Sequence, residues 1–248
     1  MKMLLKYEFR KSWSAKLIAL GLFAVLEAAL LLGLLFDHSR TVGFATGLLV
    51  FAAFVVPMAI GIASVVILHR DMNSKQGYML FMTPRNCYQI LGAKVIENGV
   101  SVLLAGVAIA LLGVLDVTLV FARYNLLDDL WAQLSKIIEA FTHLSIDRTT
   151  VLLFFFSVLC SWLCTVNIAY FADILSSSIL RGKKFSGLVA FIFFIVISLL
   201  VSRLGFFAFE SLNRKPVSYL LADAVYSLVC AVALYFGAAA IMDRNLNV

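Results

Sequence analysis

The stretch LIALGLFAVLEAALLLGLLF, residues 17–36, contains a single charged side chain, Glu27. A helix that crosses the hydrocarbon core of a bilayer needs about 20 mostly apolar residues, so this stretch predicts a membrane span. Further stretches of the chain are comparably long and apolar. The six predicted spans are Leu17–Phe36, Val42–Leu68, Gly99–Phe121, Thr149–Phe171, Ser186–Phe206 and Val217–Ile241.

The composition belongs to a membrane protein. The chain is 63% hydrophobic and 14% charged, with a mean hydropathy of +1.02, whereas soluble domains are about 45–50% apolar. Backbone groups in lipid must be hydrogen-bonded internally, which leaves helices or the strands of a closed barrel. The alternating pattern of barrel strands is absent. The sequence therefore predicts an all-α polytopic membrane protein with a single transmembrane domain over residues 1–248.

The basic residues predict how the chain crosses the membrane. Thirteen of the twenty lysines and arginines fall before the first span, between spans two and three, between spans four and five, or after the sixth. Because cytoplasmic loops are enriched in lysine and arginine, both termini are expected in the cytoplasm. The net charge of +6 therefore reflects topology, and no nucleic acid is expected as a partner. The first span exceeds a signal-peptide core and should be retained as an anchor.

Residues 1–16 predict a helix that lies in the membrane interface. Apolar residues of this segment, among them Leu4, Phe9 and Trp13, share one helical face, and lysines and arginines surround the other. Such a helix can place its apolar side in the acyl boundary and its cations on anionic lipid. The alternative is a frayed basic tail that only sets topology.

The cytoplasmic connection at residues 70–88 has internal structure of its own. Thr83 followed by Pro84 has the pattern of a helix start, with threonine as the N-cap and proline at the first helical position. We therefore expect a helix from Thr83 into the third span, and a separate short amphipathic element at about residues 71–81. Earlier in the chain, Pro57 predicts a kink in the second span.

Glycines recur every seven residues along the third span. Seven residues of α-helix return to nearly the same direction, so these glycines form a stripe that another helix could approach closely. The alternative is that glycine is simply common in membrane helices. The predicted helix-packing residues are Gly92, Gly99, Gly106 and Gly113.

The long outer connection at residues 122–148 repeats leucine, isoleucine and aromatic residues at steps of three and four. This period predicts an amphipathic helix on the outer leaflet. The alternative is a segment that caps a cavity or contacts a ligand.

No residues suggest catalysis, cofactor binding or a metal site. The phosphate-binding pattern Gly-x4-Gly-Lys-Ser/Thr is absent, and the three histidines are scattered. Ionisable residues inside spans mark function or buried pairing, and Glu27 is the deepest. It is interpreted either as hydrogen-bonded between helices or protonated, or as part of a transport route. Partial hydration is expected for Asp116, Asp173 and Asp223, and no second acid or base is expected at the depth of Glu27.

Two adjacent motifs carry a family resemblance. The segment DMNSKQGYMLFMTP, residues 71–84, is followed by QILGAK, residues 89–94, and the chain ends in AAIMDRNLNV. In their order and spacing these segments resemble the membrane (permease) subunit of an ABC-type exporter, in the bacterial six-span form of the type-2 permease class. The resemblance covers essentially the whole chain. The chain departs from the class in its short 207–216 connection, so the outer helices of the class are not carried over.

The resemblance implies a multi-pass subunit of the bacterial plasma membrane that moves a substrate outward. It would pair with a second permease copy or a paralogue and recruit a cytoplasmic ABC ATPase, which would bind the ATP and Mg that this chain does not. Residues 70–88 would couple the two subunits. The coupling residues implied are Asp71, Lys75, Gln76, Gly77, Tyr78, Thr83 and Pro84.

Alternatives remain at the level of sequence. The chain could be a non-transporting membrane scaffold or sensor subunit that docks a soluble protein through the same connection. It could also be a secondary transporter, which the absence of a convincing inverted repeat makes less favoured. Neither the substrate nor the choice between a homodimer and a heterodimer can be inferred from spans this apolar.

Overall fold

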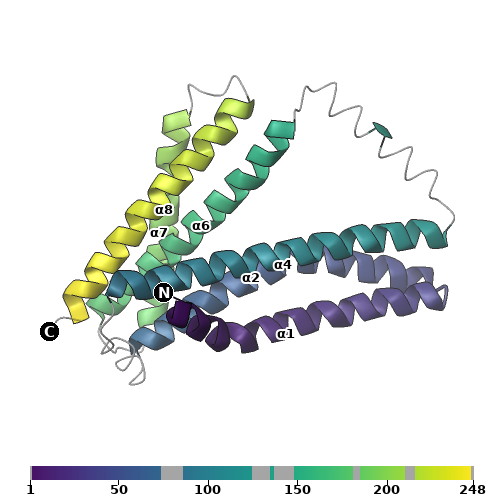
Figure 1. The fold of residues 1–248 in the computed structure, drawn as a ribbon, viewed down its shortest axis with the longest axis horizontal. Helices are drawn as coiled ribbons and strands as arrows, with labels where there is room; N and C mark the ends of the chain where they lie inside the picture. Colours follow the sequence, from purple (N-terminus) through teal and green to yellow (C-terminus); the bar gives the residue numbers. More distant parts are fainter. Residues whose placement is uncertain are drawn as a thin grey trace. The chain divides into compact units, whose positions relative to one another are not determined.

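The computed structural model describes residues 2–73, 86–124, 135–136, 148–180, 185–209 and 216–246. The regular structure of these residues is entirely helical, which confirms the expected fold class (Figure 1). The helices are α1 (Lys2–Leu35), α2 (Ser39–Asn73), α4 (Cys87–Arg123), α6 (Arg148–Ile179), α7 (Ser186–Phe209) and α8 (Pro216–Leu246).

Each of these six helices is long and apolar enough to cross a membrane. They contain 24 to 37 residues, or roughly 36 to 55 Å at 1.5 Å per residue. The hydrocarbon core is about 30 Å thick. The helices therefore extend past the apolar segments predicted from the sequence, which explains why the observed bounds are wider than the predicted ones.

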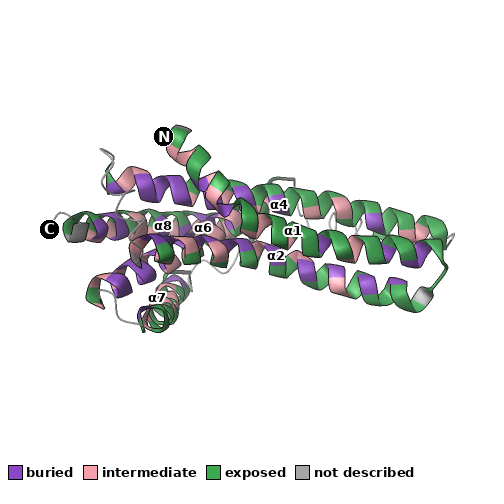
Figure 2. Ribbon diagram, turned by 90° about the horizontal axis from the view of Figure 1, so that it is seen from below, coloured by how far each residue is buried: buried purple, intermediate pink, exposed green. Residues whose placement is uncertain are grey.

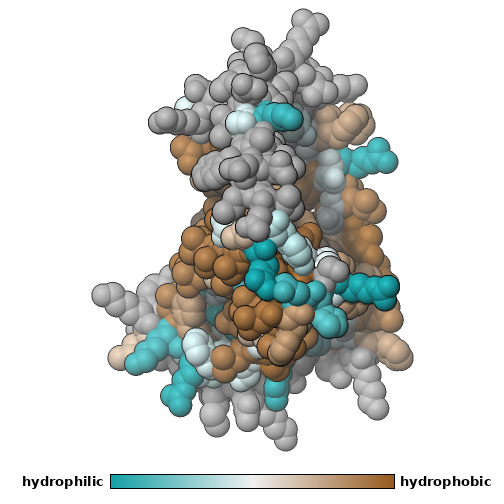
Figure 3. Space-filling model, turned by 90° about the vertical axis from the view of Figure 1, so that its right-hand side faces the viewer, coloured by the Kyte–Doolittle hydropathy of each residue, from teal (hydrophilic) through white to brown (hydrophobic). Residues whose placement is uncertain are grey.

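The described surfaces are apolar, as lipid-facing surfaces are. The most apolar window of α7 has none of its residues buried within the chain, and exposed positions follow α1, α2 and α4 along most of their length (Figure 2). Apolar side chains cover much of the described surface in Figure 3. Lipid tails are as apolar as leucine, so these faces are compatible with a bilayer.

The chain divides into two compact units. The first, unit A, comprises residues 9–63 and 98–146. In it α1, α2 and α4 lie side by side (Figures 1 and 2). Small and branched side chains such as Leu30, Ala45, Val56 and Ala105 fill its core.

Asp37 forms the turn between α1 and α2 in unit A. It has a φ of 53°, a left-handed conformation that aspartate tolerates better than most residues. Its carboxylate accepts two hydrogen bonds from Arg123 at the end of α4, at 3.0 Å from Nε and 2.6 Å from Nη2. Both side chains are largely exposed.

The second, unit B, comprises residues 1–8, 64–97 and 147–248. Its core joins the end of α2 and the start of α4 to α6 and α8, through residues that include Leu68, Leu91, Tyr170 and Met242. A smaller cluster around Cys164, Ile168 and Ala231 packs against α7 side chains. Unit B therefore contains the helix ends on both sides of residues 74–85.

Some predicted boundaries differ from the structure. Helix α1 runs unbroken from Lys2 to Leu35, so no break separates the predicted interfacial segment 1–16 from the first span. Pro57 lies inside the continuous helix α2. The predicted helix start at Thr83–Pro84, the element at 71–81 beyond Asn73, and most of the segment 122–148 lie outside the described residues.

The glycine stripe has two different environments. Gly92 is buried and Gly99 is half-buried, whereas Gly106 and Gly113 are exposed. A Cβ atom added at Gly106 or Gly113 would meet no described atom within 4 Å. Against the part of the chain that the structure describes, these two positions are therefore open.

Candidate functional site

Lys94 is buried between two carboxylates in unit B. Its ammonium donates hydrogen bonds of 2.8 Å to Glu8 Oε2 and 2.8 Å to Asp71 Oδ2. The three side chains are between 2% and 5% exposed. Charges are buried where they are paired and hydrogen-bonded, as these three side chains are. We refer to Glu8, Asp71 and Lys94 as the ionic cluster.

The ionic cluster joins three segments that are far apart in the sequence. Glu8 lies near the start of α1, Asp71 near the end of α2 and Lys94 in the third turn of α4. It contains one cation and two acids, and Glu8 Oε1 is buried without a hydrogen-bond partner among the described residues. The cluster therefore contains more acidic than basic side chains among the residues named here.

Two side-chain pairs connect α2 to α6 beside the ionic cluster. His69 Nδ1 lies 2.6 Å from Asp173 Oδ1, and the Asp173 side chain is only 3% exposed. The hydroxyls of Ser64 and Tyr170 are hydrogen-bonded to each other farther along the same two helices. These pairs fix how the end of α2 lies against α6.

The remaining helices of unit B are attached through backbone carbonyls. Tyr235 Oη, on α8, donates a 2.6 Å hydrogen bond to the carbonyl of Tyr88 at the start of α4. Ser176 Oγ, near the end of α6, donates a 2.6 Å hydrogen bond to the carbonyl of Ser186 at the start of α7. Separate polar contacts thus connect the helix ends that flank residues 74–85 with the rest of unit B.

The structure tests few of the predicted coupling residues. Asp71 is described, and it is buried in the ionic cluster rather than exposed. The others, from Lys75 to Pro84, lie outside the described residues. Sequence reasoning did not identify the pairing of Glu8 with Lys94, although Glu8 is the sole acid in a basic N-terminal segment and Lys94 ends the second family motif.

Partial hydration, expected for the acids in the later spans, is wrong for two of them. Asp173 is 2% exposed and is paired with His69. Asp116 is 9% exposed. Both are held by packing, because the neighbouring helices cover them even though they lie away from the middle of their spans.

Glu27 has an acidic neighbour, contrary to expectation. Within unit A, Asp116 on α4 is the hydrogen-bonding and electrostatic neighbour of Glu27 on α1. One oxygen of each carboxyl, Glu27 Oε2 and Asp116 Oδ1, is buried without a partner among the described residues. Two carboxylates this close repel each other when both are ionised. The pair therefore places two acidic side chains together inside predicted spans.

The described residues hold no group of three or more His, Cys, Asp or Glu side chains that could bind a metal ion. Comparisons with protein-family models, with curated proteins and with solved structures find no match. The assignment of function therefore depends on the chain's own residues and contacts.

Proposed function

We propose that this chain is the membrane subunit of an exporter whose ATP is hydrolysed on a separate cytoplasmic subunit. The buried ionic cluster of Glu8, Asp71 and Lys94 carries the proposal. Asp71 lies just before residues 74–85, and Lys94 lies soon after them. A docked subunit that pushes on this connection would therefore move α2 and α4 together, because ion pairs held out of water join them.

Packed and hydrogen-bonded side chains can transmit movement between elements. His69 with Asp173 extends such contacts to α6, and Tyr235 with Tyr88 extends them to α8. In this account Lys75, Gln76, Gly77, Tyr78, Thr83 and Pro84 supply the docking surface, while Asp71 anchors it. The partner is an ABC ATPase that binds ATP and Mg²⁺, and the complex lies in a bacterial plasma membrane with both termini in the cytoplasm.

Co-purification tests this partnership. The full chain, affinity-tagged and extracted in mild detergent from cells that make it naturally, is expected to retain a stoichiometric soluble subunit that contains a phosphate-binding loop. Recovery of a stoichiometric partner without an ATPase motif would favour the scaffold or sensor alternative. Recovery of the chain alone would count against both assignments.

A second copy of the chain, or a paralogue, would cover the glycine stripe. We expect Gly106→Leu to weaken dimer formation by about 1–3 kcal/mol, because an added side chain overfills a close helix interface. Within the folded chain, a Cβ added at Gly106 would meet no described atom within 4 Å. Quantitative cross-linking in lipid measures the dimer, and thermal unfolding of the same sample checks the fold.

Gly21→Leu is the matched control for this prediction. Gly21 lies on α1 and is exposed, and a Cβ added there would likewise meet no described atom within 4 Å. Dimer formation should be unchanged in this variant. An equal effect of the two substitutions, or no effect of either, would mean that the stripe is not an interface.

The Glu27–Asp116 pair favours a second candidate, a proton-coupled secondary transporter. In that case proteoliposomes with an imposed pH gradient and no ATP should show a chain-dependent proton flux, measured with a trapped pH dye. Glu27→Gln should abolish this flux, whereas Asp37→Asn, at an exposed acid, should not. An exporter driven by ATP should show no such proton flux. Detection of the flux would therefore favour the proton-coupled transporter over the exporter.

A further inference from the structure

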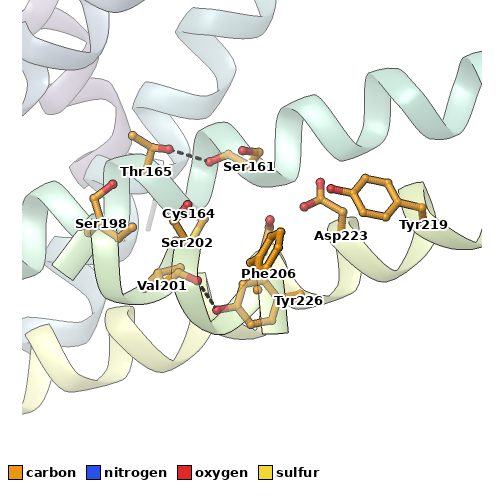
Figure 4. A pocket seen from close by; sticks show the side chains of 13 residues that line it. Ser161, Cys164, Thr165, Ser198, Val201, Ser202, Phe206, Tyr219, Asp223 and Tyr226 are labelled. Atoms are coloured by element: carbon orange, nitrogen blue, oxygen red, sulfur yellow. Dashed lines mark hydrogen bonds between the residues drawn. The ribbon is translucent and has the colours of Figure 1, made fainter. Parts of the chain in front are cut away.

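A cavity lies among α6, α7 and α8, wholly within unit B. Its volume is about 420 Å³, within the range of roughly 300–1,000 Å³ typical of small-molecule sites. Figure 4 shows side chains of all three helices around it. Sequence reasoning did not predict this pocket.

Polar side chains line the pocket at helical spacing. Ser161 and Thr165 are four residues apart on α6, as are Ser198 and Ser202 on α7 and Asp223 and Ser227 on α8. Residues four apart share a helix face, so each helix turns a polar stripe toward the same space. The regular spacing on three helices is the signal that could have revealed the pocket from the sequence.

Helix packing among the described residues does not explain these stripes. Ser161, Thr165 and Ser202 are exposed in helices long enough to cross a membrane. Thr165 Oγ1 donates to the carbonyl of Ser161 on its own helix, at 2.9 Å, and so does not join two helices. Polar groups are unfavourable against lipid tails. The stripes therefore indicate an occupant that can hydrogen-bond.

The ionisable lining of the pocket is acidic. Asp223 is the one carboxylate in the lining, and none of the described residues that line the pocket is basic. Ser157 Oγ donates a 2.6 Å hydrogen bond to Asp223 Oδ2, which orients the carboxyl group. An ionisable residue within a membrane span is by default a functional-site candidate, and the complement of an acidic side chain is a cation.

Aromatic rings form part of the same lining. Tyr226 is fixed against α7, because its hydroxyl donates a 2.6 Å hydrogen bond to the carbonyl of Val201. Gly205 permits this approach, since a Cβ there would lie 3.1 Å from Tyr226 Cε1. Phe206 and Tyr219 also line the space (Figure 4). The faces of such rings attract cations, especially when water is excluded.

We propose that this pocket binds an organic cation that carries an apolar or aromatic body. Asp223 pairs with the positive charge, the hydroxyl stripes bind polar groups of the ligand, and the rings contact its apolar part. That such cations are the exported substrate rests on the function proposed above. The binding of such cations to the pocket does not depend on that function, because every residue that lines the pocket belongs to this chain.

Tetraphenylphosphonium and tetraphenylborate are suitable probes because they have nearly the same size and shape but opposite charge. The full chain in nanodiscs of neutral phosphatidylcholine is titrated with each by equilibrium dialysis, and empty nanodiscs are subtracted. We expect saturable binding of the cation and none of the anion. Equal binding of both ions, or no saturable binding of the cation, would overturn the proposal.

Asp223→Asn should weaken cation binding by at least about tenfold, because a hydrogen bond or contact to a charged group is lost. Asp243→Asn is the matched control, since Asp243 is an exposed acid on the same helix and does not line the pocket. It should bind as the unchanged chain does. Equal affinities in the two variants would contradict the assignment of Asp223.

Ser202→Trp tests the location independently of charge. The indole should fill the space between α7 and α8 and abolish cation binding, with unfolding temperature measured on the same sample. Undiminished binding in this variant would place the cation elsewhere and refute the pocket. Cation binding without a co-purifying ATPase would support the pocket and contradict the exporter. A co-purifying ATPase without cation binding would support the exporter and contradict the pocket.

Discussion

Lys94→Met is expected to lower the free energy of unfolding by about 3–5 kcal/mol, because removing one member of a buried ion pair leaves an uncompensated charge. Here two carboxylates, those of Glu8 and Asp71, lose their shared cation. Unfolding in mixed micelles, followed by circular dichroism, measures the change. If the proposed ATPase partner is correct, the same variant should also weaken coupling to it, because the ion pair between Asp71 of α2 and Lys94 of α4 is lost.

Two further variants separate burial from charge. In the triple variant Lys94→Met, Glu8→Gln, Asp71→Asn no charge is left unpaired, so most of the lost stability should return. Arg123→Met removes the exposed partner of Asp37 and should cost less than about 1 kcal/mol. If Lys94→Met were no more damaging than Arg123→Met, the ionic cluster would not hold these helices together.

Tyr78→Ala is expected to weaken binding of the ATPase by about 30-fold or more, since a buried aromatic anchor commonly contributes at least 2 kcal/mol at an interface. Membrane insertion should be unaffected, because Tyr78 lies outside the six spans predicted from the sequence. Binding of the purified ATPase to the chain in nanodiscs measures the loss.

Tyr124→Ala is the control for this substitution, because Tyr124 is an exposed tyrosine next to the end of α4. It should bind the ATPase normally. An unchanged complex with unchanged ATP turnover in Tyr78→Ala, and also in the Gln76–Tyr78 double alanine variant, would remove this connection as the coupling element.

The six helices can be predicted because the bilayer itself imposes the length and polarity of each segment. The span at residues 17–36 can be recognised from its own length and hydropathy, without information about the helices that pack against it. The helix ends are less predictable. Helix α1 continues through residues 2–16, where lysines and arginines interrupt the apolar run and hydropathy no longer marks the helix.

The polar contacts cannot be predicted, because their partners are far apart in the sequence. Glu8 and Lys94 are separated by 86 residues, and His69 and Asp173 by 104. Which acid meets which base depends on how helices pack, and no local pattern contains that information. For this reason the sequence alone suggests partial hydration for Asp116. In the structure Asp116, on α4, neighbours Glu27, on α1.

Measuring ATP hydrolysis tests most directly the proposal that this chain transports by means of ATP hydrolysed on another subunit. ATP hydrolysis is followed for the chain purified alone in nanodiscs and for the chain with its co-purified partner. The account predicts no turnover above empty nanodiscs for the chain alone, and turnover in the complex that falls in Tyr78→Ala. Turnover by the chain alone, or a partner complex without turnover, would contradict it.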